Sequence, residues 1–250
     1  MRLDNKVALV TGGAQGIGQG IAERFVEAGA AVAIFDINGE GAREVARGLG
    51  RALALEGDVA DEEQVKAAVA QTVARLGALD VLVNNAGIEI SGTVAEMSSE
   101  TWDRVLAVNL RGAFLCSKYA IPHMRGRGGA IVNISSVHAF HSYPHEPAYD
   151  ASKSGMIGLT RTMALDHGKD GIRVNAICPG YIRTPLLERW FSELPNPEET
   201  MREVLKHHPL GRIGTPRDIA DAALFLASEA ASFVSGAYLV VDGAMTVSGH

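Results

Sequence analysis

The sequence predicts an α/β protein built on a doubly wound parallel sheet of about seven strands, with helices on both faces. Short runs rich in Val, Ile, Leu and Ala alternate with longer segments that carry helical patterns. Such alternation makes consecutive strands parallel. The chain has 250 residues, of which 47% are hydrophobic, and this is enough to bury a large core. We therefore expect one domain over residues 1–250.

The expected strands are short, and the segments between them are long enough to serve as crossover helices. We expect strands at 7–10, 31–35, 53–55, 81–83, 131–134, 174–177 and 238–241. We expect helices at 17–27, 39–47, 62–76, 101–124, 148–167 and 216–226. Two of the helices have recognisable N-caps, because Asp61 precedes an acidic first turn and Thr215 precedes a proline.

The segment 180–214 breaks this alternation. It contains four prolines and scattered large apolar residues, with no clear strand. It follows the sixth expected strand, and doubly wound sheets bind ligands beyond the carboxyl ends of their strands. We therefore interpret the segment as a substrate lid. The alternative is a surface insertion without a functional role.

Composition excludes several classes of protein. The net charge is -6 and no basic run occurs, so we expect no nucleic-acid partner. No apolar run approaches the roughly 18 residues of a membrane span, so we expect no membrane partner. Two cysteines are too few for a disulfide-stapled domain, and the N-terminal residues lead into a strand without the apolar stretch of a signal peptide. A cytoplasmic location is therefore expected.

A glycine-rich turn connects the first expected strand to the first helix, with the sequence Thr11-Gly12-Gly13-Ala14-Gln15-Gly16-Ile17-Gly18. Because glycine has no Cβ, main-chain N–H groups can approach a pyrophosphate here, and the helix N-terminus adds favourable partial charge. A strand-turn-helix context of this kind is typical of dinucleotide binding in a Rossmann-type fold. The spacing of the glycines is looser than in the common G-x-G-x-x-G pattern.

Asp36 ends the second expected strand. A carboxylate at this point can accept hydrogen bonds from the hydroxyls of an adenosine ribose and repels a 2′-phosphate. Gln15 adds no positive charge and no cation follows Asp36 directly, so NAD is favoured over NADP; Arg43 is the nearest downstream cation. The alternative is that Asp36 is a turn residue before Asn38.

Tyr149 and Lys153 are four residues apart in an expected helix, so their side chains leave the same face. A phenol ordinarily has a pKa of about 10. A cation about 4 Å away at an effective dielectric constant of 20 contributes roughly 4 kcal/mol, enough to bring the pKa of Tyr149 toward neutrality. The positive nicotinamide of NAD would act in the same direction. Such a tyrosine can serve as general base toward an alcohol and as general acid toward a ketone.

Together these motifs resemble the short-chain dehydrogenase/reductase family, in its branch of about this length, over essentially the whole chain. The residues that carry the resemblance are Thr11 to Gly18, Asp58-Val59, Asn84-Asn85-Ala86-Gly87, Asn109, Ser136, Tyr149-Asp150-Ala151-Ser152-Lys153, and Pro179-Gly180 with Thr184. The resemblance implies a sheet of order 3-2-1-4-5-6-7. It also implies a homotetramer that uses the helices around 101–124 and 148–167 and the C-terminal strand.

The resemblance assigns catalytic roles to four residues. Ser136 bonds to the substrate oxygen, with Ser135 as the adjacent alternative, and Tyr149 moves the proton. Asn109 holds a water through its backbone and so links Lys153 to solvent. Without the other motifs, Asn109 would read as a helix asparagine that bonds locally.

The resemblance also implies a set of cofactor contacts. Asp58 is implied to contact the adenine, residues 85–87 to form the floor beside the adenosine ribose, and Lys153 to hold the nicotinamide ribose. Ile182 and Thr184 are implied to orient the carboxamide. Beyond the glycine turn and Asp36, the set is Asp58, Val59, Asn85, Ala86, Gly87, Tyr149, Lys153, Pro179, Gly180, Ile182 and Thr184.

The loop between Ser136 and Tyr149 is rich in polar and titratable residues. This favours a small-molecule substrate that is held by hydrogen bonds, such as a sugar, polyol or hydroxy acid. The candidate substrate contacts are Glu89, His138, His145, Glu146, Arg183 and Trp190. The alternative is that the histidines face solvent. They lack a recognisable ligand framework, so we expect no metal.

The sequence therefore predicts an NAD-dependent oxidoreductase that interconverts a secondary alcohol and a ketone, with a sugar or polyol as substrate. One rival is a reductase of 3-oxoacyl or steroid-type ketones. A rival of another class is a non-catalytic NAD-binding regulatory protein. Loss of Ser136, Tyr149 or Lys153 would be the simplest signature of that second rival, and all three are present.

Overall fold

A seven-stranded parallel sheet runs through the described part of the computed structural model, residues 1–192 and 195–248. Its order is β3-β2-β1-β4-β5-β6-β7, with all pairs parallel, as expected. The strands are β1 (Val7–Thr11), β2 (Ala31–Asp36), β3 (Ala52–Glu56), β4 (Val81–Asn84), β5 (Gly129–Ile134), β6 (Ile172–Pro179) and β7 (Tyr238–Val241). The inner strands are buried along their length, which explains why they read as continuous apolar runs.

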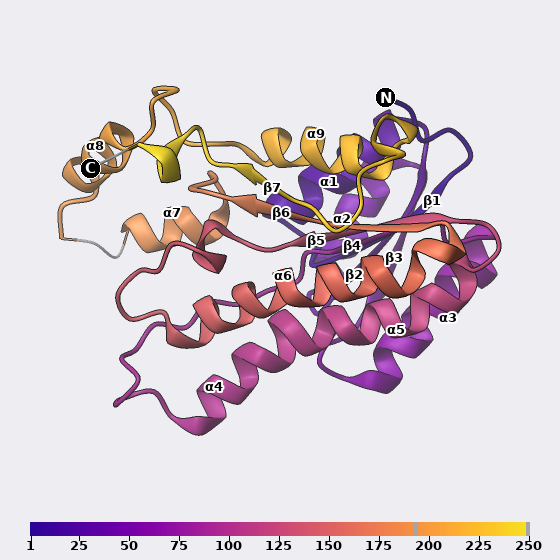
Figure 1. Ribbon diagram of the computed structural model, residues 1–250, viewed down its shortest axis with the longest axis horizontal. Coiled ribbons are helices and arrows are strands. Elements are labelled where there is room, and N and C mark those ends of the chain that lie inside the picture. The colour runs from indigo at the N-terminus through magenta and orange to yellow at the C-terminus, as the bar shows by residue number, and fades with distance from the viewer. Residues whose placement is uncertain (193–194, 249–250) are drawn as a thin grey trace.

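Helices cover both faces of the sheet (Figure 1). One face carries α1 (Gly16–Glu27), α2 (Gly39–Leu49) and α9 (Pro216–Ala227). The other carries α3 (Glu62–Leu76), α4 (Ser99–Leu106), α5 (Gly112–Met124) and α6 (Pro147–His167). Among the described residues, no helix combines the length and apolar character that crossing a membrane requires.

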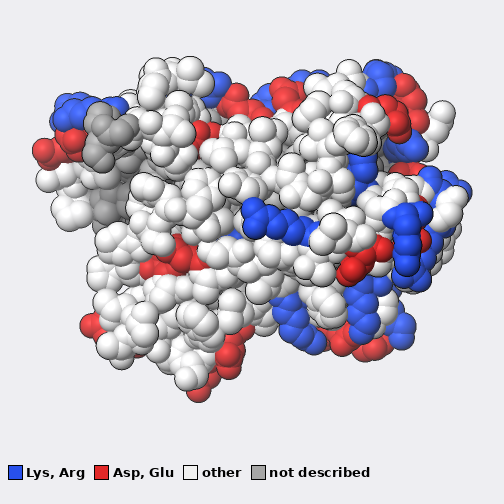
Figure 2. All heavy atoms as spheres, viewed as in Figure 1, with Lys and Arg blue, Asp and Glu red and all other residues white. Residues whose placement is uncertain are grey.

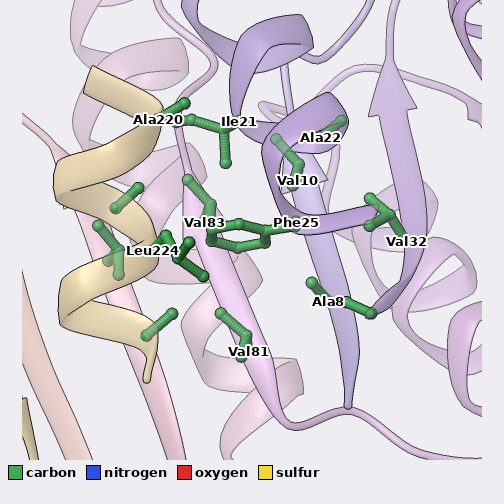
Figure 3. Close-up of a cluster of buried hydrophobic side chains, with 14 of the residues drawn as sticks. Ala8, Val10, Ile21, Ala22, Phe25, Val32, Val81, Val83, Ala220 and Leu224 are labelled. Carbon is green, nitrogen blue, oxygen red and sulfur yellow. The ribbon is translucent and has the colours of Figure 1, made fainter. Parts of the chain in front are cut away.

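The core under α1 and α9 shows why these segments form helices on the sheet. Apolar side chains recur on one face of α1 and turn toward the strands, so their burial holds the helix in place. Phe25 of α1 is fully buried and its ring points toward Leu224 of α9, beside Val83 of β4 (Figure 3). This packing holds α1 against the sheet and against α9.

Both expected caps are confirmed. Asp61 accepts a hydrogen bond from the Gln64 N–H at 3.0 Å. At the start of α9, the Asp218 carboxylate accepts from the Thr215 N–H at 2.7 Å. Each cap satisfies a main-chain N–H that the first helical turn leaves without a partner.

The expected helix 101–124 is interrupted. It begins at Ser99, where Ser98 Oγ accepts from the Thr101 N–H at 3.1 Å, and it passes through a π-helical turn at Ala107–Arg111 before α5. The wider turn lets the Gly112 N–H donate to Ala107 O, five residues back. Apolar periodicity does not distinguish a π turn from an α-helix.

Residues 180–214 contain two helices that the sequence analysis did not predict, α7 (Pro185–Ser192) and α8 (Pro197–Lys206). Each begins with a proline, which suits the first helical position because its missing N–H would have no partner there. Both helices lie at one end of the sheet (Figure 1). This end receives the carboxyl ends of the strands.

Candidate active site

Tyr149 and Ser136 meet beyond the carboxyl end of β5. Tyr149 lies in the first turn of α6, which starts at Pro147, and Ser136 follows β5 by two residues. A hydrogen bond from Ser136 lowers the pKa of Tyr149, against the larger effect of burial. Ser136 Oγ also accepts from the His138 N–H at 3.2 Å, which orients the hydroxyl.

The neighbouring Ser135 has a different environment. Its Oγ donates to the main-chain oxygen of Lys153 at 2.8 Å, and the residue is buried. Its hydroxyl proton is therefore used to join β5 to α6. Of the two serines, Ser136 is the one placed against Tyr149.

Lys153 is buried beneath Tyr149. Its Nζ donates to Ile134 O at 3.0 Å and lies 5.3 Å from the centroid of the Tyr149 ring. Burial disfavours the ammonium form and lowers the pKa of Lys153 to about 8.

The pKa of Tyr149 moves in the opposite direction to the one expected from its spacing to Lys153. Burial of the phenol raises this pKa, and the charge of Glu89 raises it further. The expected lowering was wrong, because one neighbouring cation does not offset the desolvation of the buried phenol. Lys153 Nζ lies over the Tyr149 ring and donates its hydrogen bond to Ile134 O.

Asn109 lies in the π turn and is fully buried. Its Oδ1 accepts from the Ile88 N–H at 2.8 Å, while its Nδ2 donates to Ile88 O at 2.9 Å and to Ser152 Oγ at 3.1 Å. The side chain thus joins three segments and holds the residue before Glu89 in place. Sequence reasoning did not predict this bridging contact.

The glycine turn after β1 forms a cradle in which Gly12 and Gly18 have no room for a side chain. Gly12 and Gly16 have φ values of 64° and 58°. A Cβ on Gly18 would lie 2.1 Å from Gly12 O, and one on Gly12 would lie 2.8 Å from the Ala86 Cα. Any side chain at Gly12 or Gly18 would therefore push the turn apart.

The N-terminus of α1 is open toward this cradle. No side chain caps it, since Gln15 makes no side-chain hydrogen bond at the N-cap. Main-chain N–H groups without partners and the helix dipole suit a pyrophosphate. Asp36 borders the turn and accepts from the N–H groups of Ala14 and Asn38 at 2.9 and 2.8 Å. These residues fit the phosphates and adenosine ribose of a dinucleotide.

Arg43 does not reach toward Asp36 as a free cation. Its Nη1 lies 3.0 Å from a carboxylate oxygen of Glu56, at the end of β3. Both side chains are exposed, so the pair adds little stability. It does nevertheless draw the guanidinium toward β3.

The loop after β4 is tied to the same cradle. Asn85 Nδ2 donates to Thr11 O and to Gly12 O at 3.0 and 2.9 Å, and the Ala86 N–H donates to Thr11 Oγ1 at 3.0 Å. A Cβ on Gly87 would lie 3.5 Å from Lys153 Nζ. Residues 85–87 therefore connect the glycine turn to Lys153.

Asp58 and Val59 lie on the loop between β3 and α3. Asp58 pairs with Arg104 at 3.0 Å and accepts from the Ala60 N–H at 2.8 Å. Val59 is buried against Gly112, at the point where the π turn ends.

Residues 179–184 lead from β6 toward the glycine turn. A Cβ on Gly16 would lie 3.4 Å from Thr184 Cγ2, so Thr184 borders the cradle. Ile182 is buried and forms a β-bridge with Gly214. Pro179 ends β6, and the Gly180 N–H donates to Val241 O at 3.1 Å.

The charges of three carboxyl groups, those of Glu89, Glu146 and Asp150, act on Tyr149. Glu89 is exposed when the whole residue is considered, but its carboxyl is partly desolvated. This desolvation, together with the charge of Glu146, raises the pKa of Glu89 to about 7. Glu146 is buried, and burial also raises its pKa. Its Oε1 accepts from Ser91 Oγ, whereas its Oε2 has no partner among the described residues. Asp150 is the third member and raises the pKa of Glu89 as well.

The remaining candidate substrate residues do not all lie together. His138 borders Tyr149, with ring centroids 5.0 Å apart. His145 is exposed, and its positive φ of 67° places its main-chain oxygen against the Gly92 N–H at 2.7 Å. Arg183 borders a hollow of about 460 Å³ between α7 and α8. The side chain of Trp190 lies outside the described part of the structure.

A buried chain of polar side chains under the site was not predicted. Asn84 Nδ2 donates to Asn133 Oδ1 at 2.8 Å and to Ser117 Oγ at 3.1 Å. Asn133 Nδ2 donates in turn to Thr160 Oγ1 at 2.8 Å. The signal in the sequence was an asparagine inside or at the end of each of two apolar strands, where a polar residue needs a partner.

Similar proteins match this chain over nearly its whole length. A sequence model described as enoyl-(acyl carrier protein) reductase matches residues 12–246. The meso-2,3-butanediol dehydrogenase of Serratia marcescens is 40% identical over 99% of this chain and 97% of its own. The 2,5-dichloro-2,5-cyclohexadiene-1,4-diol dehydrogenase of Sphingobium indicum is 44% identical over 98% of each chain.

A solved structure agrees with the fold in detail. The ligand-free aldohexose dehydrogenase of Thermoplasma acidophilum superposes with a TM-score of 0.91 at 40% identity, covering 99% of this chain and 96% of that one. These comparisons confirm the resemblance carried by the sequence motifs. The chain belongs to the short-chain dehydrogenase/reductase family, whose dehydrogenases act on CH–OH groups with a nicotinamide cofactor.

Proposed function

We propose that the protein is an NAD-dependent dehydrogenase that oxidises a secondary alcohol of a neutral sugar or polyol. The observation that carries this proposal is the placement of Tyr149 between Ser136 and the buried Lys153, with the carboxyl groups of Glu89 and Glu146 close by. The first three residues supply acid–base chemistry. The two glutamates supply acceptors for further hydroxyl groups of a substrate.

In this proposal each residue has a defined step. A bound nicotinamide cofactor supplies the hydride acceptor. Tyr149, as phenolate, takes the proton of the substrate hydroxyl, and Ser136 donates a hydrogen bond to the oxygen on which negative charge develops. Lys153, as ammonium, offsets the charge of the phenolate and holds the nicotinamide ribose. Asn109, in the π turn, holds the water that carries the proton onward.

The preference for NAD rests on Asp36. Its carboxylate borders the glycine turn, where it can accept from both hydroxyls of the adenosine ribose. A 2′-phosphate would meet this negative charge. Arg43, the nearest downstream cation, is paired with Glu56, which supports the same preference.

The remaining cofactor contacts follow from their positions around the cradle. Asp58 and Val59 are proposed to border the adenine, and residues 85–87 to form the floor beside the adenosine ribose. Ile182 and Thr184 are proposed to orient the carboxamide. The closeness of Thr184 to Gly16 supports this assignment.

The substrate class rests on charge. Besides burial, the charges of Glu89, Glu146 and Asp150 raise the pKa of Tyr149, so negative charge near the phenol would repel an anionic substrate. Neutral hydroxyl groups can donate to carboxylates, so a sugar or polyol suits the site. Two similar proteins, a butanediol dehydrogenase and an aldohexose dehydrogenase, support this substrate class by their names.

We further propose that residues 1–250 form one domain in which 180–214 acts as the lid. The bridge between Ile182 and Gly214 joins the two ends of this segment, which supports treating it as one unit. Arg183 and Trp190 are its proposed substrate contacts. His145 is proposed to contact the substrate from the opposite loop.

We propose a homotetramer in the cytoplasm. The edge strand β7 exposes Tyr238, Leu239 and Val240, and Phe140 packs beside Tyr238 at a centroid distance of 5.8 Å. Few charged side chains cover the middle of the face that contains α6 and β7 (Figure 2). Exposed apolar surface of this extent supports association. Both cysteines are free and buried, which suits a reducing compartment.

The test is an NADH-absorbance assay of the purified protein against secondary alcohols, including polyols, aldoses, hydroxy acids and steroids. We expect reduction of NAD with at least one neutral polyol or aldose and little reduction of NADP. Turnover restricted to 3-oxoacyl or steroid-type ketones would overturn the substrate class. Absence of turnover with every alcohol and ketone, while NADH still binds, would favour a non-catalytic NAD-binding protein. Light scattering after gel filtration tests the tetramer.

A further inference from the structure

His138 and Asp150 form a polar pair beside Tyr149. His138 Nδ1 lies 2.6 Å from Asp150 Oδ1. The imidazole ring stands edge-on to the Tyr149 ring at a centroid distance of 5.0 Å, and it packs on the Tyr143 ring at 4.5 Å. These contacts hold the imidazole in one orientation in the wall of the active site.

The same contacts define which ring nitrogen carries the proton. Burial lowers the pKa of His138, so the neutral imidazole predominates at neutral pH. An ionised carboxylate can only accept, and Nδ1 must therefore donate to Asp150. The lone pair then resides on Nε2.

Nε2 is available to a ligand. Among the described residues Nε2 has no hydrogen-bond partner, and it is not one of the polar atoms that are buried away from solvent without a partner. His138 is otherwise largely covered by protein, with 16% of its side chain exposed. The imidazole of His138 thus offers an oriented, neutral acceptor to the site.

The position of this acceptor relative to Ser136 decides what it can bind. The main-chain N–H of His138 donates to Ser136 Oγ at 3.2 Å, and this bond fixes the two residues to each other. Since the His138 ring lies 5.0 Å from the Tyr149 ring, an oxygen held by Ser136 and Tyr149 is close to the imidazole, and so is the carbon next to the reacting one. A hydroxyl on that carbon can donate to Nε2.

We propose that His138, oriented by Asp150, binds the hydroxyl on the carbon next to the reacting one, so that the enzyme prefers substrates with a vicinal diol. This rests on the proposed function, since it needs Tyr149 and Ser136 to hold the reacting oxygen. Asp150 acts here as a positioning residue. The competing explanation is that His138 only fills space between Tyr143 and Tyr149, as a phenylalanine could.

The test compares kcat/KM for three alcohols that share a reacting secondary hydroxyl: butane-2,3-diol, butane-1,3-diol and butan-2-ol. We expect the wild type to prefer the 2,3-diol over the other two. His138→Phe keeps an aromatic ring and removes the acceptor, and the preference for the 2,3-diol over butan-2-ol should fall about tenfold, the effect of one hydrogen bond. His138→Gln, which keeps an acceptor, should recover part of the preference.

Two further variants separate positioning from packing. Asp150→Ala should raise KM for the 2,3-diol more than for butan-2-ol, and Asp150→Asn, whose carbonyl can still accept from Nδ1, should recover it. His141→Phe alters an exposed histidine of the same loop and should leave the ratio of the two substrates unchanged.

The outcomes are distinguishable. An equal loss for all three alcohols in His138→Phe would show a packing role and overturn the inference. A wild type that oxidises secondary alcohols without preferring the vicinal diol would overturn it too, leaving the proposed function intact. Absence of turnover with any alcohol would overturn both.

Discussion

Lys153 Nζ lies 5.3 Å from the centroid of the Tyr149 ring and donates to Ile134 O at 3.0 Å. Burial lowers the pKa of the lysine to about 8 and raises that of the tyrosine. Burying either the ammonium of Lys153 or the phenolate of Tyr149 by itself therefore costs free energy. Together, ammonium and phenolate form a pair with no net charge, so ionisation of Tyr149 is easiest while Lys153 stays protonated.

The buried ammonium of Lys153 should lower the stability of the fold. Its folded pKa of about 8 lies below its ordinary value of 10.5, so the penalty is fully present below about pH 8 and disappears as the pH rises past 10.5. Lys153→Met should therefore raise Tm by several degrees at about pH 6.5, while activity is lost. The measurement is calorimetry at about pH 6.5 and about pH 10. A variant that is less stable at the lower pH would contradict the assigned cost of the charge.

The two adjacent serines should separate function from stability. Ser136→Ala removes the donor beside Tyr149, and kcat should fall about 10²- to 10³-fold, as for other lost donors to a developing oxyanion. Ser135→Ala removes the bond to Lys153 O and should cost about 1 kcal/mol of stability, with a much smaller effect on kcat. Steady-state kinetics and thermal melts of both variants decide this. If Ser135→Ala were the more severe catalytic variant, the roles would have to be exchanged.

Asp36 should control the choice of cofactor. Asp36→Ala removes two charged acceptors from the ribose and the repulsion of a 2′-phosphate, so kcat/KM for NAD should fall about tenfold or more while that for NADP rises. The ratio of the two kcat/KM values is the measurement. Arg43→Ala is the matched control, because its guanidinium is paired with Glu56, and the ratio should hardly change. A wild type that prefers NADP would refute the role of Asp36.

Glu89 should make stability depend on pH. Its folded pKa of about 7 lies above its ordinary value of 4.5. Its contribution to the stability of the fold is therefore fully present below about pH 4.5 and is lost as the pH rises through 7. Glu89→Gln should therefore gain stability relative to the wild type at about pH 8.5, and gain much less at about pH 5.

The control for Glu89 is Glu96→Gln on the same loop, where a hydrogen bond from Thr93 lowers the carboxyl pKa. This variant should show no gain at the higher pH. Melting curves of both variants at the two pH values provide the comparison. A gain for Glu89→Gln that is independent of pH would mean that the carboxyl is not perturbed.

The fold could be predicted from the sequence because its signals are local. Buried parallel strands such as β1 read as apolar runs, and caps such as Asp61 lie next to the helices that they start. The π turn at Asn109 could not be predicted, because it depends on contacts with Ile88 and Ser152, from other segments. Helices α7 and α8 were missed because their prolines suggested a loop.

The active site was only partly predictable for the same reason. Motif order located Tyr149, Ser136 and Lys153, and helical spacing explained why two of them share a face. The pKa of Tyr149 depends on burial, which the spacing of two residues does not contain. The pairing of His138 with Asp150 also required the folded chain, since 12 residues separate them.

The central claim is that Tyr149 moves the proton, and Tyr149→Phe tests it most directly. This change removes only the hydroxyl, so NADH should still bind with nearly wild-type affinity, as measured by fluorescence titration. The value of kcat should fall about 10²- to 10⁴-fold, the usual contribution of a positioned general base. A Tyr149→Phe variant that binds NADH normally and retains near wild-type kcat would contradict the account.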